Sequence, residues 1–223
     1  MSLYFSILFF SFLFPFALSF DKKVSFYKYW KYLFPSIGIV ATVFVVWDFI
    51  FTHYAFWGFT DKYLNGFFLF NLLPIEEVLF FIIIPYCCLF IYEVVKSYFP
   101  NLKFKQVTKY FSLFVVVSGV CLSLFFADNS YTFSACLLSV LLTVFSFRYQ
   151  PNFPFFMLSF IISIIPFIIV NGILTGIVTP EPVVWYSESE IIGLRIFTIP
   201  LEDFYYSYSL LLSVAILYER FKR

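Results

Sequence analysis

Two pairs of acidic residues interrupt otherwise apolar stretches of the chain and are the first candidates for chemistry. The segment LPIEEVLFF carries Glu76 and Glu77, and the segment IPLEDFYY carries Glu202 and Asp203. Both share the pattern proline–apolar–acid–acid. Burial and a neighbouring carboxylate each favour the protonated form of a carboxyl group, so paired acids in apolar surroundings are suited to donating protons near neutral pH.

The composition indicates a polytopic membrane protein. Of 223 residues, 62% are hydrophobic, 26% aromatic and only 12% charged, whereas a soluble domain carries about 25% charged residues. The mean hydropathy is +0.95. Apolar runs of the roughly 20 residues needed to cross a bilayer recur along the chain. Backbone groups in hydrocarbon must bond to each other, so these runs are predicted to be helices.

We therefore expect an all-α fold with seven transmembrane helices. The predicted spans are residues 2–20, 33–52, 67–92, 107–126, 131–147, 155–177 and 196–218. The first span has no basic residue before it, whereas Lys22 and Lys23 follow it. That is the reverse of a secretory signal peptide, so this helix is expected to be retained.

The basic residues divide unequally between the two sides of this topology. The side of the C-terminus holds twelve of the fourteen, namely Lys22, Lys23, Lys28, Lys31, Lys96, Lys103, Lys105, Lys109, Arg148, Arg220, Lys222 and Arg223. Only Lys62 and Arg195 fall on the other side. The positive-inside rule predicts a multi-pass cell-membrane protein with its N-terminus outside and its C-terminus in the cytoplasm.

The acidic motif belongs to a longer internal repeat. Pro74 and Pro200 lie 200 − 74 = 126 residues apart. Further matched positions are Glu76 with Glu202, Glu77 with Asp203, Tyr92-Glu93 with Tyr218-Glu219, and Asp48-x-x-x-Thr52 with Asn171-x-x-x-Thr175. We expect two three-helix units in the same orientation, residues 1–95 and 129–223, joined by a linking helix within residues 96–128.

The repeat places both acid pairs at one depth, in the outer half of the bilayer. An ionisable residue within a span is costly and normally faces the bundle interior or a water-filled cavity. Asp48 and Asn171 are expected to converge on the same depth from neighbouring helices. Alternatively, the acids only end their helices at the interface, which Pro74 and Pro200 allow because proline is favoured in a first helical turn. Duplication at matched depth favours a functional site.

PIEEVLFF and PLEDFYYS, each with an Asp/Asn-x-x-x-Thr element upstream, resemble the integral-membrane carotenoid (lycopene) cyclases. In that family two three-helix units occur as separate subunits or fused in one chain, and this chain resembles the fused form over nearly its whole length. The resemblance thus implies no obligate protein partner. One departure is that Asp48 in the first unit matches Asn171 in the second, which argues against equal roles for the two units.

The resemblance implies a redox-neutral cyclisation of the linear ends of lycopene. An acid protonates carbon 2 of the end group and leaves a cation at carbon 1. The nearby double bond closes a six-membered ring, and a base removes a proton from carbon 6 to give a β-ionone ring. The implied substrate is a hydrophobic carotenoid drawn from the membrane lipid, with neither cofactor nor metal. Aromatic rings can stabilise the cation.

Adjacent helical residues point about 100° apart, so both acids of a pair cannot face one substrate atom. We favour Glu76 and Glu202 as the acid and base, because the first position is Glu in both copies. Glu77 and Asp203 would then tune or anchor them. The residues expected to line the cavity are Asp48, Thr52, Asn171, Thr175, Pro74, Pro200, Phe80, Phe81, Tyr205 and Tyr206. Packing alone explains the four aromatic residues equally well.

The remaining conspicuous residues have structural interpretations. Trp57 and Trp185 are interpreted as interfacial belt residues. The Tyr-Glu pairs at positions 92–93 and 218–219 are interpreted as anchors at the cytoplasmic helix ends. The four cysteines are interpreted as apolar filler, and the sequence shows no metal-binding motif or basic nucleic-acid patch.

Three other classes of protein predict different sequence features. A flavin-dependent cyclase needs a G-x-G-x-x-G fingerprint, which the sequence lacks. A retinal protein needs a lysine in its last span, and residues 196–218 contain none. A small proton-coupled transporter remains the alternative, but it predicts polar lining through both leaflets. The ring type, the number of ends cyclised, the particular carotenoid and the oligomeric state stay open.

Overall fold

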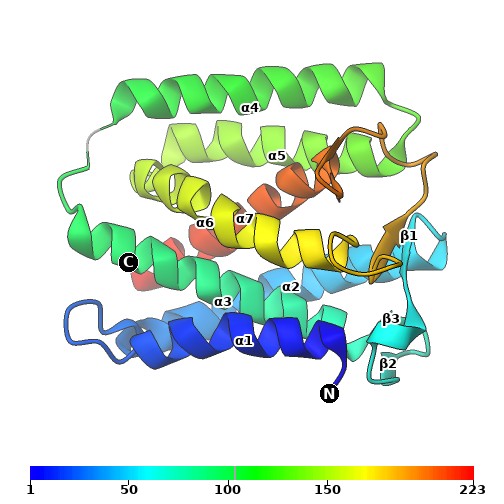
Figure 1. Ribbon diagram of the computed structural model, residues 1–223. Coiled ribbons are helices and arrows are strands. Elements are labelled where there is room, and N and C mark those ends of the chain that lie inside the picture. The colour runs from blue at the N-terminus through cyan, green and yellow to red at the C-terminus, as the bar shows by residue number, and fades with distance from the viewer. Residues whose placement is uncertain (103) are drawn as a thin grey trace.

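Long apolar runs form the helices of a bundle whose axes run in broadly the same direction (Figure 1). The computed structural model describes residues 1–102 and 104–223; Lys103, one of the basic residues counted above, lies outside them. Within these residues there are seven α-helices. They are α1 (Leu3–Leu18), α2 (Trp30–His53), α3 (Ile75–Tyr98), α4 (Lys105–Phe125), α5 (Ser130–Tyr149), α6 (Phe153–Leu174) and α7 (Leu201–Lys222).

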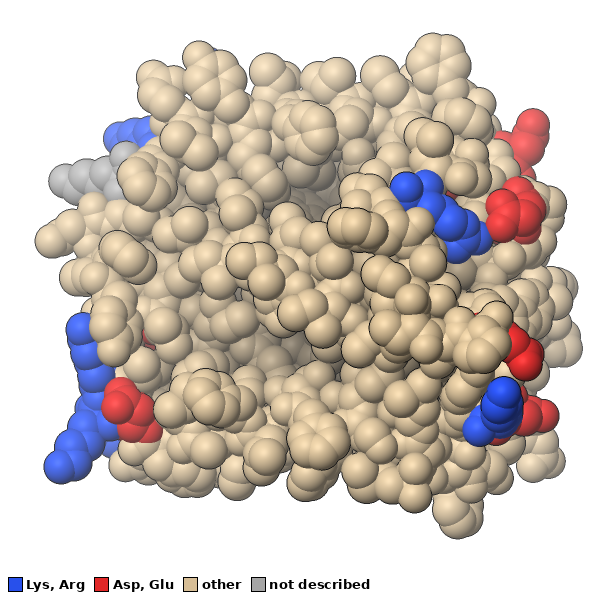
Figure 2. Space-filling model, viewed as in Figure 1, with Lys and Arg blue, Asp and Glu red and all other residues tan. Residues whose placement is uncertain are grey.

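Length and composition of the helices are those of an integral membrane protein. Five segments are long and apolar enough to span a bilayer: α3, α4, α5, α6, and α2 with the short 3-10 turn before it, from Phe26 to His53. The α1 helix has 16 residues, about 24 Å at 1.5 Å per residue, and is a shorter apolar helix. Charged side chains gather at two ends of the visible face and leave an uncharged middle (Figure 2).

The α7 helix carries the second acidic motif and lies inside the bundle, packed against α2, α3, α5 and α6. The packing of the first three helices is repeated by the last three. Thus α1 packs on α3 as α5 packs on α7, and α2 packs on α7 as α6 packs on α3. The α4 helix lies outside this set and packs mainly on α5 (Figure 1).

Two helices begin later than the apolar runs predict. The predicted spans 67–92 and 196–218 become α3, which begins at Ile75, and α7, which begins at Leu201. The residues before each helix form a small antiparallel hairpin instead. The strands are β2 (Phe68–Leu69) with β3 (Leu73–Pro74), and β5 (Arg195–Ile196) with β6 (Ile199–Pro200).

Backbone geometry explains the late starts. Phe70, Asn71 and Phe197 have φ angles of 49°, 56° and 57°, in the left-handed region that a right-handed helix cannot include. Pro74 and Pro200 then stand directly before the helices. Proline has no N–H, and at this position an intrahelical bond from that group would not form in any case.

A third strand pair covers the end of the bundle at which α3 and α7 begin. Strand β1 (Trp57–Phe59) pairs antiparallel with β4 (Val184–Tyr186), so the loops that follow α2 and α6 are joined. Trp57 is only 6% exposed. Its interpretation as an interfacial belt residue is therefore wrong, because the strand pairing turns its ring into the protein.

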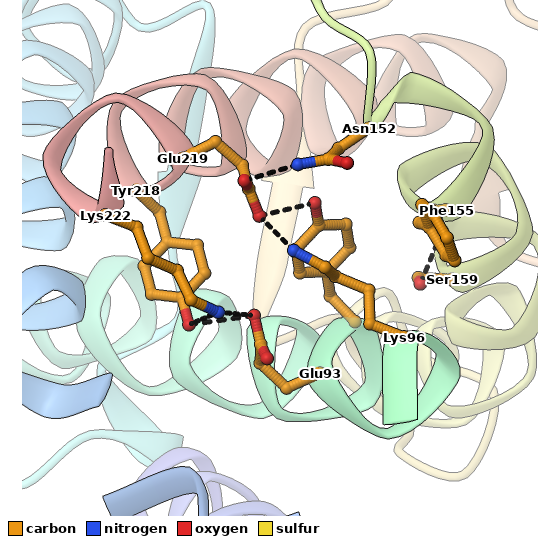
Figure 3. Close-up of polar contacts among 9 residues, drawn as sticks. Glu93, Lys96, Asn152, Phe155, Ser159, Tyr218, Glu219 and Lys222 are labelled. Atoms are coloured by element: carbon orange, nitrogen blue, oxygen red, sulfur yellow. Dashed lines mark hydrogen bonds and ion pairs between the residues drawn. The ribbon is translucent and has the colours of Figure 1, made fainter. Parts of the chain in front are cut away.

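At the opposite end, α3 and α7 are joined by a cluster of tyrosine, glutamate and lysine side chains (Figure 3). This α3–α7 clamp consists of Tyr92, Glu93, Lys96, Tyr218, Glu219 and Lys222. Tyr92 donates to Glu219 at 2.8 Å, and Lys96 reaches the same oxygen at 2.7 Å. Tyr218 and Lys222 bind Glu93 in the same way, at 2.9 and 2.8 Å. The Tyr-Glu pairs thus bind each other's helix.

The clamp gives a stability prediction. Glu93 is 3% exposed, and Lys222→Met leaves its carboxylate bonded only to Tyr218. Removing one partner of a fully buried ion pair lowers the free energy of unfolding by about 3–5 kcal/mol. The Lys222 side chain is 20% exposed, and partial exposure to solvent weakens an ion pair. We therefore expect the free energy of unfolding to fall by about 2 kcal/mol, which is measured as a lower melting temperature in detergent.

Two controls accompany this variant. Lys105→Met removes an exposed lysine at the start of α4 and is expected to melt with the parent protein. The double variant Glu93→Gln/Lys222→Met should lose less stability than Lys222→Met, because no buried charge is left unpaired. Equal melting temperatures for Lys222→Met and Lys105→Met would contradict a stabilising clamp.

Candidate active site

The first acid of each pair fastens the start of its helix to neighbouring chain segments. Glu76 Oε1 accepts hydrogen bonds from the Ser2 hydroxyl at 2.9 Å and the Asn65 N–H at 2.7 Å. Glu202 Oε1 accepts the matching hydrogen bonds from the Thr132 hydroxyl at 2.6 Å and the Ile192 N–H at 2.8 Å. Both carboxylates are buried in a first helical turn, where the helix dipole favours negative charge.

The second acid of each pair faces a cavity. Glu77 and Asp203 both line it, together with the tyrosines that bind them. The Tyr4 hydroxyl donates to Glu77 Oε2 at 2.5 Å. The Tyr131 hydroxyl donates to Asp203 Oδ1 at 2.7 Å, and Tyr186 donates to Oδ2 at 2.9 Å. The roughly 100° between adjacent helical residues separates the cavity-facing acids from the first acids.

The upstream Asp/Asn element reaches the same cavity from α2 and α6. Asp48 is 1% exposed, and its Oδ1 accepts from the Trp57 indole N–H at 2.5 Å and the Thr52 hydroxyl at 3.2 Å. Asn171 instead donates its side-chain N–H to Asp203 Oδ2 at 3.4 Å. The Asp/Asn difference between these matched positions therefore makes the site asymmetric, with a third carboxyl group on the α2 side.

Electrostatics links these groups. Glu77 lies close enough to Asp48 and Asp203 for their charges to interact. Tyr186, on strand β4, has a pKa raised well above its usual value, first by burial and then by the Asp203 charge. Tyr186 therefore remains protonated and acts as a hydrogen-bond donor. Among the described residues, no three His, Cys, Asp or Glu side chains are placed to hold a metal ion.

The cavity has a volume of about 210 Å³ and walls from α1, α2, α3, α5, α6, α7 and the β1–β4 strand pair. The carboxyl groups lie where α3 and α7 begin. Further along α3, the lining includes Ile84 and Ile91, and α6 contributes Phe160 and Phe167. The cavity is thus polar at one end and apolar over the rest of its length.

Aromatic rings surround the polar end. Trp57 and Tyr131 have ring centroids 4.9 Å apart, and Tyr131 stacks on Tyr186 at 5.9 Å. The Tyr206 ring lies 6.1 Å from Trp57 and 5.9 Å from Tyr131. Such faces carry negative electrostatic potential that attracts a cation.

The sequence-predicted residues divide into two groups. Those that line the cavity are Glu77, Asp203, Asp48, Asn171, Thr175, Phe80 and Tyr206. The structure places the others behind it or at the helix starts: Glu76, Glu202, Thr52, Pro74, Pro200, Phe81 and Tyr205. Phe81 is buried in the core, and Tyr205 donates to the Ser118 hydroxyl at 2.9 Å. The geometry therefore favours the second acids over the first as groups that meet a ligand.

Four residues of the site, Tyr4, Trp57, Tyr131 and Tyr186, escaped the sequence reasoning. Tyr4 and Tyr131 lie 131 − 4 = 127 residues apart, close to the offset of the acid motif, so extending the repeat to the first helix of each unit would have found them. Trp57 and Tyr186 depend on the pairing of β1 with β4, for which the sequence gives no local signal.

A cavity with carboxyl groups at one end and apolar walls beyond them is suited to acid–base chemistry on a hydrophobic molecule inside a membrane. Comparison with known protein families gives a match to the family described as lycopene cyclase, over residues 1–95 and 128–221. The chain belongs to this family. The match falls in two segments that are separated by the region of α4, which is consistent with a duplicated unit. No curated protein and no solved structure matches the chain.

The bond between Trp57 and Asp48 gives a prediction about the site's stability. Trp57→Phe keeps an aromatic ring in β1 but removes the N–H that Asp48 accepts. We expect the free energy of unfolding to fall by about 1.5–3 kcal/mol, the range for a hydrogen bond to a charged group. The change is measured by thermal unfolding in detergent. Trp185→Phe, on the facing strand and 39% exposed, is the control. Equal melting temperatures for the two variants would contradict the importance of this bond.

Proposed function

We propose that this protein is a carotenoid end-group cyclase that converts the linear ends of lycopene to β-ionone rings. One observation carries the proposal. In a chain of the lycopene cyclase family, both acidic motifs reach one cavity, through Glu77 and Asp203. That cavity is aromatic around the acids and apolar beyond them, as a hydrocarbon substrate requires.

Glu77 is the proton donor in this proposal. Within the described residues it accepts one hydrogen bond, from Tyr4, and it lies near the charges of Asp48 and Asp203. A carboxyl group among other carboxyl groups in an apolar cavity is suited to carrying a proton. Glu77 gives that proton to carbon 2 of the end group, and the cation forms at carbon 1.

Asp203 is the base. It accepts hydrogen bonds from Tyr131, Tyr186 and Asn171, an arrangement that suits an ionised carboxylate, which only accepts. After the nearby double bond has closed the ring, Asp203 takes the proton from carbon 6. One proton enters and one leaves, so the reaction is an isomerisation with no redox change.

The aromatic residues stabilise the cation between these two steps. Trp57, Tyr131 and Tyr206 surround the acids, and cation–π attraction in a desolvated site contributes about 2 kcal/mol or more. An aromatic ring offers this stabilisation without a strong nucleophile that would trap the cation.

We further propose two parallel three-helix units, residues 1–95 and 129–223, with residues 96–128 as the link. The repeated helix packing and the matched bonds of Tyr4 to Glu77 and Tyr131 to Asp203 support this arrangement. The proposed topology has seven transmembrane helices, the N-terminus outside and the C-terminus in the cytoplasm. It rests on the distribution of Lys and Arg.

A proton-coupled transporter needs polar groups along a path through both leaflets. Here the carboxyl groups among the residues that line the cavity are Asp48, Glu77 and Asp203, and all three lie at its polar end. This distribution supports an enzyme that meets its substrate within the bilayer.

The activity is tested by expressing the protein in lycopene-accumulating bacteria and analysing the pigments. We expect cyclic carotenoids with β-ionone rings, because the base is proposed to take the carbon 6 proton. ε-Rings would correct the ring type alone. Unchanged lycopene, with the protein shown to be folded in the membrane, would overturn the proposed function.

The acid assignment is tested by four matched variants in the same cells. Glu77→Gln and Asp203→Asn are expected to lower cyclisation by about 10²–10⁴-fold, the usual contribution of a general acid or base. Glu76→Gln and Glu202→Gln keep a carbonyl oxygen for the helix-start bonds and are expected to remain active. The reverse pattern, with all four proteins folded, would return the acid–base role to Glu76 and Glu202.

A further inference from the structure

The cavity continues away from the acids as a groove between α1 and α6, with α3 as its floor. Ile84, Cys87 and Ile91 follow one face of α3 at helical spacing and line the floor. Ser11 of α1 lies on one side and Ile164 of α6 on the other. These five residues define the α1–α6 groove. Figure 2 shows a hollow in the uncharged middle of the face, over α3 in the view of Figure 1.

Burial changes along the length of the cavity. At its polar end Asp48, Trp57, Tyr131 and Asp203 are between 1% and 6% exposed, while Glu77 and Tyr186 are partly exposed. The groove residues are all partly exposed. Most of the polar end is therefore enclosed, while the groove opens on the apolar face of the bundle, which is the face that meets lipid.

The acid end and the groove together form a long cavity. Ile91 lies 91 − 77 = 14 positions beyond Glu77 on α3, a distance of about 21 Å at 1.5 Å per residue. The part beyond the acids is lined by aliphatic, aromatic, serine and cysteine side chains. Its shape and chemistry fit a thin, extended hydrocarbon that continues from a smaller group held at the acids.

We propose that the α1–α6 groove binds the polyene chain of the substrate while the reacting end group occupies the enclosed polar end, so that the substrate enters sideways from the bilayer. This inference rests on the proposed function. Continuity with the acids identifies the occupant, because a molecule in the groove has its end beside Glu77. The strand pair of Trp57 and Tyr186 covers the other end of the cavity.

The test compares two tryptophan substitutions at adjacent positions of α6. Ile164 lines the groove, whereas Ile165 is 68% exposed and is not among the residues that line it. The purified proteins are reconstituted in phosphatidylcholine vesicles that contain increasing mole fractions of lycopene. Cyclic products are measured to obtain kcat and the half-saturating mole fraction of lycopene.

Ile164→Trp is expected to raise the half-saturating mole fraction at least about tenfold with kcat within about twofold, because it removes binding made equally in the ground and transition states. Ile165→Trp should have the same half-saturating mole fraction and the same kcat as the parent protein. Ile91→Trp, at the far end of the groove from the acids, is the second groove variant and should behave like Ile164→Trp.

Two results would overturn the inference. Groove variants that saturate like Ile165→Trp would show that the groove does not hold the polyene and is filled by lipid acyl chains. A fall in kcat alone would indicate a disturbed acid site. A parent protein that forms no cyclic product would instead overturn the proposed function, so the two failures are distinguishable.

Discussion

The cost of burying carboxyl groups in an apolar protein constrains the whole structure. A carboxylate out of water needs donors or a cation, since its desolvation is otherwise expensive. In this protein the groups that stabilise each buried carboxyl group differ from one position to another. Glu76 and Glu202 use backbone N–H groups and hydroxyls at helix starts, Asp203 uses tyrosines and an asparagine, and Glu93 uses a lysine with a tyrosine. The helix starts, the covering strands and the clamp each supply partners to a buried carboxyl group.

Which parts of this arrangement a sequence can predict depends on whether they are local. Composition and periodicity predict α2, α4, α5 and α6 to within a few residues, because an apolar run of that length in a bilayer must be helical. Hydropathy fails at residues 67–74, where apolar side chains form a hairpin. The left-handed backbone angles of Phe70 and Asn71 distinguish this hairpin from a helix.

The choice between the two acids of each pair also depends on non-local contacts that the sequence does not show. The spacing of the acids predicts that one of each pair faces a cavity, but the choice depends on how α3 and α7 are rotated about their axes. That rotation is set by contacts far away in sequence, such as Tyr4 with Glu77 and Tyr131 with Asp203. The Glu at the first position of both copies makes matching hydrogen bonds. The sequence pattern alone cannot separate such a shared structural bond from shared chemistry.

In the proposed arrangement, two similar units meet in one cavity, which favours a division of roles between them. Had each unit closed its own site, the two acid motifs would be expected to stay alike, since each would have to donate and remove protons. Because both motifs reach one chamber, each acid can specialise. Asp48 beside Glu77 concentrates carboxyl groups on one side, whereas Asn171 gives Asp203 a third donor on the other. In the proposed mechanism, this single Asp/Asn difference gives chemical direction to a nearly symmetric framework.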